Sequence, residues 1–434
     1  MDLLKNIFKG DKVIWIIFLM LCLISIIEVF SASSTLIYRS GNHWEPITRH
    51  CIFLMAGGLV VVLFHNIPYK WFQVFPLFLL PFSAVFLLLL LLFDNLNLGG
   101  LLVIEKVNDA GRWVRLFGFQ FQPSEFAKMA VVIVTAFILS KNQGERSASP
   151  SAFKHIMIIT CVICGLILPE NFSTAFLLAA VVFLMMIIGR IATRYLLLLG
   201  GGVMAVAVAG VIFLEATKGI ESDFLHRFDT WRARVEQFVH PEQVPPEKFD
   251  INHNAQVGHA RIAVASSNVL GKGPGNSVQR DFLSHAYSDF IYAIIIEELG
   301  LVGGIVVVVL YFWLLVRVGR IASRCTRTFP AFLILGIALL LVTQAMFNMM
   351  VAVGMAPVTG QPLPLISKGG TSTFINCAYI GMILSVSRYT AAQREKEQQA
   401  AADGQLPAAL AADSQAQSGE EPQSAALNSD DELK

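Results

Sequence analysis

Stretches of about 20 consecutive apolar residues limit the fold of this chain more than any other feature, because a helix of that length crosses a hydrocarbon layer of about 30 Å. About ten such stretches follow one another along the chain. They lie at approximately 13–33, 49–65, 72–93, 123–141, 153–169, 172–190, 195–216, 288–316, 330–354 and 371–388. The break at 169–172 predicts either a tight turn or a kink in one long helix. Because a backbone inside a bilayer must satisfy its own hydrogen bonds, the expected fold is an all-α polytopic membrane protein.

The composition agrees with a membrane protein and argues against one class of partner. Hydrophobic residues make up 55% of the 434 residues and charged residues 15%, whereas soluble domains are about 25% charged. The formal net charge is only +1, and no basic block runs along the chain, so nucleic acid is not an expected partner. Membrane lipid is the expected surrounding instead.

The basic residues predict how the spans are oriented. With a cytoplasmic N-terminus, the short connections on the cytoplasmic side carry most of the Lys and Arg, as the positive-inside pattern requires. These residues are Lys70, Lys141, Arg146, Arg190, Arg194, Arg317, Arg320, Arg324, Arg327, Arg388 and Arg394. An even number of spans then places both termini in the cytoplasm. We expect a cytoplasmic N-terminus at 1–12, a transmembrane domain at 13–389, and a disordered cytoplasmic tail at 390–434, which lacks aromatic residues.

Two connections on the opposite face are long, at 94–122 and at 217–287, the latter between the seventh and eighth spans. Long connections in a compact protein are usually functional. Asp289 stands at the outer end of the eighth span, and Glu297 and Glu298 lie inside that span. Position alone leaves Asp289 open as a solvated carboxylate or a catalytic group. Buried acids in a span are functional or paired, so the two glutamates are either structural or catalytic supports.

The segment "FQPSEFAKMAVVIV" predicts a helix that begins at Pro123, where the missing N–H costs nothing. Glu125 and Lys128 are one turn apart on it and share a face. One interpretation is an internal ion pair that allows both charges to enter a span. The other uses the positive end of the helix: Lys128, with Arg112 from the preceding connection, would bind a pyrophosphate.

Glycine and proline gather at 351–372, "VAVGMAPVTGQPLPLISKGGTS". This pattern predicts an unwound or re-entrant connection, which needs a lining of protein or water at membrane depth. The "SKGGTS" end could hold phosphate, although it lacks the spacing of a P-loop.

Taken in order, these segments resemble the SEDS family (shape, elongation, division and sporulation) of bacterial cell-wall glycosyltransferases over about residues 10–390. The matching segments are "FSAS", "AGRWVRLFGFQFQPSEFAK", "NAQVGHARIAVASSNVLGKGPGNSVQ", "SDFIYAIIIEELGLVGG" and "GMAPVTGQPLPLISKGGTS". "GNSVQ" and "NMMVAVGMAP" are closer to the FtsW-type division branch than to the RodA-type elongation branch. The chain departs from the family pattern at "LPENFST", at His259 and at Lys368.

The resemblance implies a lipid II polymerase that works on the outer face of the bacterial cytoplasmic membrane, at the division septum. It implies Asp289 as the general base and Glu297 and Glu298 as supporting residues. Substrate contacts are expected from Arg112, Gln122, Glu125, Lys128, Gln256, Asp281, His285, Ser367, Gly369 and Gly370. No cofactor is required, although a divalent cation, Mg²⁺ or Mn²⁺, is left open because carboxylates face a pyrophosphate.

The resemblance also implies partners: a single-pass class B penicillin-binding protein that cross-links the new strand, and other membrane proteins of the divisome. Three alternatives stay open. The chain could transport lipid II without polymerising it, serve elongation in place of division, or act only as a scaffold. A transporter would need polar groups through the middle of the membrane. The candidate site residues of this chain instead lie in the predicted outer half, which favours the enzyme.

Overall fold

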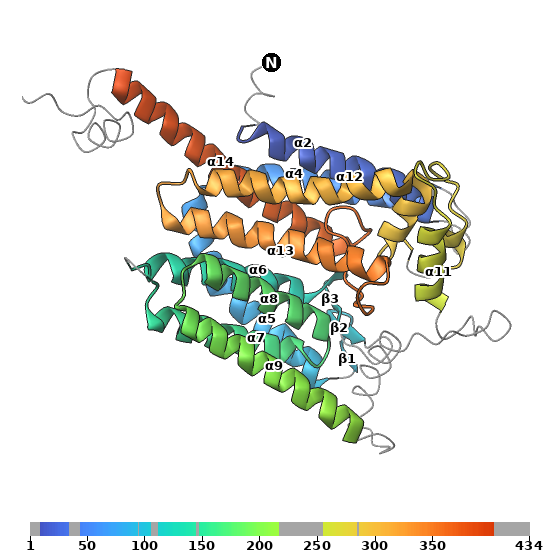
Figure 1. The fold of residues 1–434 in the computed structure, drawn as a ribbon, viewed down its shortest axis with the longest axis horizontal. Helices are drawn as coiled ribbons and strands as arrows, with labels where there is room; N and C mark the ends of the chain where they lie inside the picture. The colour runs from blue at the N-terminus through green and yellow to red at the C-terminus, as the bar shows by residue number, and fades with distance from the viewer. Residues whose placement is uncertain are drawn as a thin grey trace, which may run out of the picture.

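The computed structural model describes residues 9–33, 44–93, 95–105, 112–144, 147–216, 255–283 and 286–402. Within them, ten helices of at least 17 residues run side by side as a bundle (Figure 1). They are α2 (Lys12–Ala32), α4 (Glu45–Asn66), α5 (Phe75–Leu92), α6 (Pro123–Lys141), α7 (Pro150–Ile167), α8 (Phe172–Ile188), α9 (Thr193–Ala216), α12 (Ile291–Ala322), α13 (Thr328–Ala352) and α14 (Gly370–Ala402). Short helical elements are η1 (Tyr69–Gln73), α11 (Ala255–Ala265) and η3 (Gln279–Asp281).

Each predicted span coincides with one of the ten long helices. Eight candidate spans, one of which joins η1 to α5, are long and apolar enough to cross a membrane, and α8 is a shorter apolar helix. Between α7 and α8 the chain makes a tight turn and not a kink: Asn171 caps α8 by accepting a hydrogen bond from Thr174 N at 3.1 Å. The multi-span helical architecture is therefore confirmed.

The helical architecture has one departure from the all-α expectation, at the connection 94–122, which holds a four-stranded antiparallel sheet in the order β1-β2-β3-β4. The strands are β1 (Asn95–Leu98), β2 (Leu102–Glu105), β3 (Val114–Leu116) and β4 (Phe119–Phe121). Leu96 pairs with Ile104, which pairs with Val114. Strict alternation of apolar and polar residues in "NLNL" and "FQF" is the period of a strand and not of a helix.

The C-terminal boundary also differs from the expectation. Helix α14 continues to Ala402, so the segment that begins at 390 is helical over its first part. Residues 403–434 lie outside the described residues, as do 217–254 of the large connection. The rest of that connection contributes α11 and η3.

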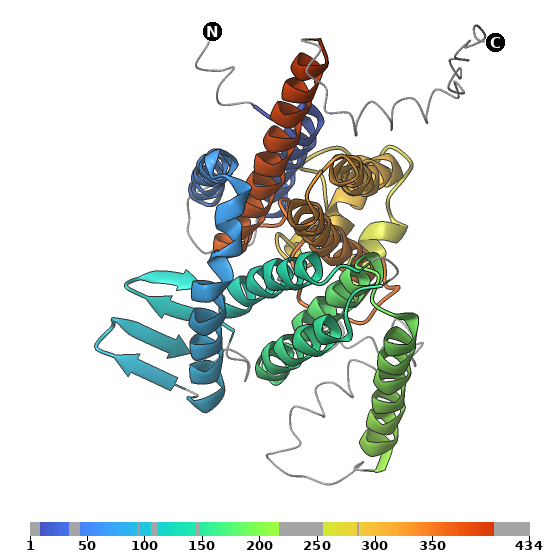
Figure 2. The same cartoon turned by 90° about the vertical axis from the view of Figure 1, so that its left-hand side faces the viewer.

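Helices α6 and α13 form the centre of the bundle, because they have the largest buried shares among the candidate spans. They pack against each other and join the group α2, α4, α12 and α14 to the group α5, α7 and α8. Helix α9 lies at the periphery, beside α8 (Figure 2). Both central helices carry buried polar side chains, Glu125 and Lys128 on α6 and Gln344 and Asn348 on α13. Gln344 and Asn348 donate hydrogen bonds to the connection that follows α13 and so join the core of the bundle to it.

Candidate active site

Asp289 is half-buried two residues before α12 begins. Ser288 Oγ donates a hydrogen bond to its Oδ1 at 2.8 Å. From α13, Asn348 Nδ2 donates to the backbone oxygen of Asp289 at 2.8 Å and to Gln361 O at 2.7 Å. A buried amide therefore ties the Asp289 backbone to the connection that follows α13.

Gly360 brings Asp289 and Arg112 to the same space. A Cβ atom built on Gly360 would lie 3.4 Å from Arg112 Nη1 and 3.6 Å from Asp289 Oδ2. Gly360 has a φ of 65°, a conformation that suits glycine. Arg112 Nε also donates to the backbone oxygen of Glu170 at 3.4 Å, which fixes the guanidinium from the α7–α8 turn. A carboxylate and a permanent cation thus face one small space at this end of the bundle.

The predicted connection after α13 is unwound and is joined to the Asp289 segment by hydrogen bonds. Ser367 Oγ donates to Ser288 O at 2.6 Å and accepts from Leu363 N at 2.8 Å. Lys368 N donates to Tyr287 O at 3.0 Å, and Lys368 Nζ lies 5.5 Å from the centre of the Tyr287 ring. Burial and the nearby Arg49 lower the pKa of Lys368. A phosphate near this lysine would favour its charged form.

Gly369 and Gly370 form the start of α14. Gly369 O accepts from Thr373 N at 2.9 Å, as in a regular first turn, and Gly370 is the first residue of the helix. Phosphate binding by this "SKGGTS" turn stays a prediction.

Lys128 and Glu125 form a buried ion pair, with 2.7 Å between Nζ and Oε1. Lys128 Nζ also donates to Gln344 Oε1 at 3.0 Å, and Gln344 Nε2 donates to Pro362 O at 3.1 Å. The geometry favours the internal ion pair over direct contact with pyrophosphate, because the Lys128 side chain is almost fully enclosed. Its contacts instead extend from α6 through α13 to the connection that carries Gly360.

Glu297 and Glu298 lie just before a break in α12 at Gly300, where φ is 71° and ψ −171°. The backbone oxygens of the two glutamates accept from Lys272 N at 3.0 Å and Gly273 N at 2.8 Å. Past the break, Leu301 N and Val302 N donate to the backbone oxygens of Asn268 and Val269. The segment 268–279, here called the α12 clamp, thus supplies the hydrogen bonds that the broken helix lacks.

The carboxylates of the same glutamates also bind the α12 clamp. Glu297 accepts from Lys272 Nζ at 2.6 Å, Ser277 Oγ at 2.5 Å and the N–H groups of Val278 and Gln279. Glu298 accepts from the N–H groups of Gly275 and Ser277 and from the hydroxyl of Ser31 in α2. Their direct contacts are with the clamp, so of the two expected roles the geometry favours structural support.

Four predicted contacts remain: Gln122, Gln256, Asp281 and His285. Gln122 is half-buried and precedes α6, and Gln256 is half-buried in the first turn of α11. Asp281 is exposed in η3, 4.0 Å from Arg280 Nε. His285 lies outside the described residues. Contact of these four residues with substrate stays a prediction.

Binding of a divalent ion also stays a prediction. Within the described ranges, no group of three or more His, Cys, Asp or Glu residues could hold a metal. An ion beside Asp289 would have to complete its oxygen ligands with pyrophosphate and water.

Sequence reasoning missed Gln344 and Asn348, which connect the site to the core. Their signal was present: they are spaced four residues apart, hence on one face, in an otherwise apolar span. Gly360 and Ser288 were missed because a contact across the fold has no local pattern.

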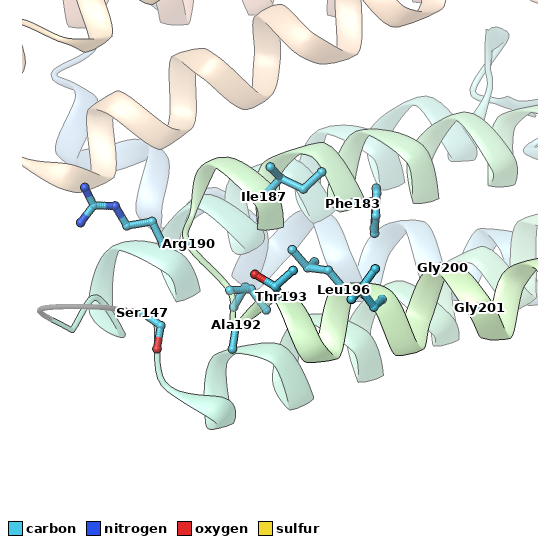
Figure 3. A pocket seen from close by; sticks show the side chains of 11 residues that line it. Ser147, Phe183, Ile187, Arg190, Ala192, Thr193, Leu196, Gly200 and Gly201 are labelled. Atoms are coloured by element: carbon cyan, nitrogen blue, oxygen red, sulfur yellow. The ribbon is translucent and has the colours of Figure 1, made fainter.

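A cavity of about 630 Å³ lies elsewhere, between the end of α8 and the start of α9 (Figure 3). It is lined mainly by apolar side chains, among them Phe183, Ile187 and Leu196, with Thr193 at one side. Helix α8 separates it from Glu170, which lies near Arg112 at the other end of that helix. The cavity is therefore not part of the Asp289 site.

Comparison with known proteins places the whole bundle in one group. The family model FTSW_RODA_SPOVE, described as a cell cycle protein, matches residues 11–392. A probable peptidoglycan glycosyltransferase FtsW of Trichlorobacter lovleyi is 31% identical over 382 residues, covering 87% of this chain and 93% of that protein. The corresponding protein of Halomonas elongata is 32% identical, covering 88% and 91%. That of Bacillus subtilis is 27% identical, covering 91% and 96%.

Solved structures agree on the fold. A chain of a peptidoglycan synthase complex, described as coordinating polymerization and crosslinking, superposes with a TM-score of 0.67 at 23% identity, covering 88% of this chain and 98% of that one. The rod shape determining protein RodA of Thermus thermophilus superposes with a TM-score of 0.60 at 22% identity, with the same coverage. At these identities the structures support the architecture alone.

Proposed function

The chain belongs to the FtsW/RodA/SpoVE family of cell cycle proteins, and on that premise we propose that it polymerises lipid II into glycan strands. It is a peptidoglycan glycosyltransferase of the division type, as its relatives are named. The observation that carries the site is the shared space at Gly360, which Asp289 and Arg112 both face. A base and a cation that face the same space suit a reaction in which a proton is removed and an anion leaves.

In the proposed reaction Asp289 is the general base. It takes the proton from the 4-hydroxyl of the acceptor GlcNAc while that oxygen attacks C1 of the donor MurNAc. The new C–O bond forms as the bond from C1 to the pyrophosphate breaks, with inversion, and undecaprenyl pyrophosphate leaves with the electron pair. Asn348 and Ser288 hold the aspartate in place through its backbone oxygen and Oδ1. General-base assistance of this kind contributes about 10²–10⁴-fold to rates.

Arg112 is proposed to stabilise the charge that develops on the leaving pyrophosphate. A guanidinium stays charged at every working pH and binds phosphate oxygens in pairs. Lys128 is proposed to act on the site only indirectly. It is paired with Glu125 and contacts Gln344, which donates a hydrogen bond to Pro362 O near Gly360. If a divalent cation takes part, Asp289 is the carboxylate proposed to face it, and the ion would help neutralise the pyrophosphate.

The setting of this activity is proposed from the loop charges and from the relatives. Both termini are proposed to be cytoplasmic, which places Asp289 on the outer face of the bacterial inner membrane, at the division septum. The proposed partner is a class B penicillin-binding protein, alongside other divisome membrane proteins. The superposed peptidoglycan synthase complex supports a partner of the cross-linking type.

The test is purified chain with its transpeptidase partner and fluorescently labelled lipid II, analysed for polymer on a gel. Wild-type protein should give a ladder of glycan products, and Asp289→Asn should give none while remaining folded. A parallel assay measures lipid II transport in sealed vesicles. Transport without any polymer from wild type would reassign the chain to a transporter, the principal alternative.

A further inference from the structure

The four-stranded sheet is amphipathic, and its pairing places all eight apolar positions of one face in two rows. The first row is Leu96, Ile104, Val114 and Phe121, and the second is Leu98, Leu102, Leu116 and Phe119. The opposite face carries Asn97, Val103, Arg115 and Gln120 in register. One face of the sheet is therefore apolar and favours burial away from water.

The first row is covered by protein, and two residues of the second row, Leu102 and Leu116, pack at its margin. Ile104, Val114 and Phe121 are buried in a cluster with Leu90 of α5. The Phe121 ring lies 5.7 Å from that of Phe82, which is almost three turns before the end of α5, or about 15 Å along its axis. The apolar face thus lies against the body of a spanning helix and not against its tip.

Phe119, at the end of the second row, and the adjoining turns remain open. Leu102 and Leu116 are half-buried, whereas Phe119 is 79% exposed. Beyond this row, Phe117 is 67% and Leu101 53% exposed, and Phe117 N donates to Leu101 O at 2.9 Å. Three large apolar side chains are therefore exposed together at one edge of an amphipathic sheet.

Short connections keep this edge close to the membrane. Helix α5 ends at Leu92 and β1 begins at Asn95; β4 ends at Phe121 and α6 begins at Pro123. Figure 2 shows the sheet extending sideways past α5, beyond the outline of the bundle. Leu88 and Leu92 are exposed on α5, which belongs to a candidate span, so we expect them to face lipid. The sheet packs on this same helix, so lipid is the occupant expected at its open edge.

We propose that the edge formed by Leu101, Phe117 and Phe119 lies in the lipid bilayer, at the headgroup–acyl boundary. Phe and Leu side chains on the apolar side of an amphipathic element enter this layer, while its polar side stays hydrated. Arg115 and Gln120, on the other face, lie toward the headgroups and water. The sheet would thereby hold the segment that carries Arg112 at a fixed depth. This proposal does not depend on the reaction, because it concerns a lipid contact alone.

The test places a photoreactive benzoylphenylalanine at Phe119 and, as a matched control, at Gln120, which is adjacent, exposed and on the polar face. The full chain is reconstituted in vesicles of phosphatidylethanolamine and phosphatidylglycerol that contain a tritiated phospholipid, then irradiated. We expect at least several-fold more lipid adduct from position 119 than from 120. Equal labelling, or none at 119, overturns the proposal.

A second pair of probe positions controls for a local disturbance of the structure at position 119. The same probe at Leu101 should label lipid, and at Arg115 it should not. Irradiation of whole-cell membranes then decides between lipid and protein as the occupant. If the probes at Leu101 and Phe119 give protein adducts in place of lipid adducts, this edge is a protein-docking surface and the proposal fails.

Discussion

Gly271 of the α12 clamp and Gly300 of α12 lie with their backbones in direct contact. A Cβ atom on Gly271 would lie 2.2 Å from Glu298 O, and one on Gly300 would lie 2.3 Å from Val269 O. Both residues have positive φ values, 73° and 71°. This approach lets the clamp replace the helical hydrogen bonds of Glu297, Glu298, Leu301 and Val302. The course of α12, which begins two residues after Asp289, therefore depends on a contact between two glycines.

Gly300→Ala should release the clamp. A φ of 71° with a ψ of −171° is a conformation almost confined to glycine, which costs another residue about 1–3 kcal/mol, and the collision with Val269 O adds to that cost. We expect a lower temperature of unfolding in detergent and a matching loss of polymerisation. The control is Gly319→Ala in the same helix, where an added Cβ meets nothing within 4 Å. An unchanged Gly300→Ala variant would mean that the clamp is not needed.

Glu297→Gln tests whether Glu297 anchors the α12 clamp or tunes the basicity of Asp289. The Glu297 carboxylate accepts four hydrogen bonds, one from Lys272 at 2.6 Å, and its side chain is fully buried. A hydrogen bond to a charged group is worth about 1.5–3 kcal/mol, so the variant should be markedly less stable. Lys272→Ala, whose side chain is partly exposed, should lose less. Anchoring predicts an unchanged pH dependence of the residual activity, whereas tuning of Asp289 predicts a shifted pH profile.

Lys128→Ala should leave Glu125 buried without its cation, which typically costs about 3–5 kcal/mol. Combining it with Glu125→Ala removes both charges, so the free energy of unfolding should return most of the way to the wild-type value. Protein yield and thermal unfolding measure the recovery, and polymer formation separates the two roles. Recovered activity in the double variant would exclude pyrophosphate binding by Lys128. A folded but inactive double variant would contradict the purely structural role.

The sequence could predict the spans and one charged pair because their signals are local. Apolar stretches gave the starts of the helices to within a few residues, although α12 and α14 run past the ends of their apolar stretches. The one-turn spacing of Glu125 and Lys128 gave the ion pair. The sheet was missed because its strands are only three or four residues long. The roles of Glu297 and Gly360 could not be read locally, because each acts on residues far away in the chain.

Asp289→Asn keeps the shape of the side chain but cannot accept the proton. We expect polymerisation to fall by about 10²–10⁴-fold, with unfolding behaviour close to wild type because the Asn348 contact is to the backbone. Asp289→Glu moves the carboxylate by one methylene and should keep only a small fraction of activity, since proton transfer needs heavy atoms within about 2.6–3.2 Å. Polymer at the wild-type rate from Asp289→Asn would remove the aspartate from the mechanism.

Arg112→Ala should lower the turnover rate more than it weakens lipid II binding, because the leaving pyrophosphate gains charge only as the bond to C1 breaks. Arg112→Lys keeps a cation but not the paired geometry of the guanidinium, so it should restore part of the rate. Arg115→Ala is the matched control: this arginine lies three residues on, exposed, and on the polar face of the sheet. Steady-state polymerisation over a range of lipid II concentrations separates kcat from KM. A loss confined to KM would assign Arg112 to substrate binding alone, and an equal loss in Arg115→Ala would point to general surface charge in place of a specific contact.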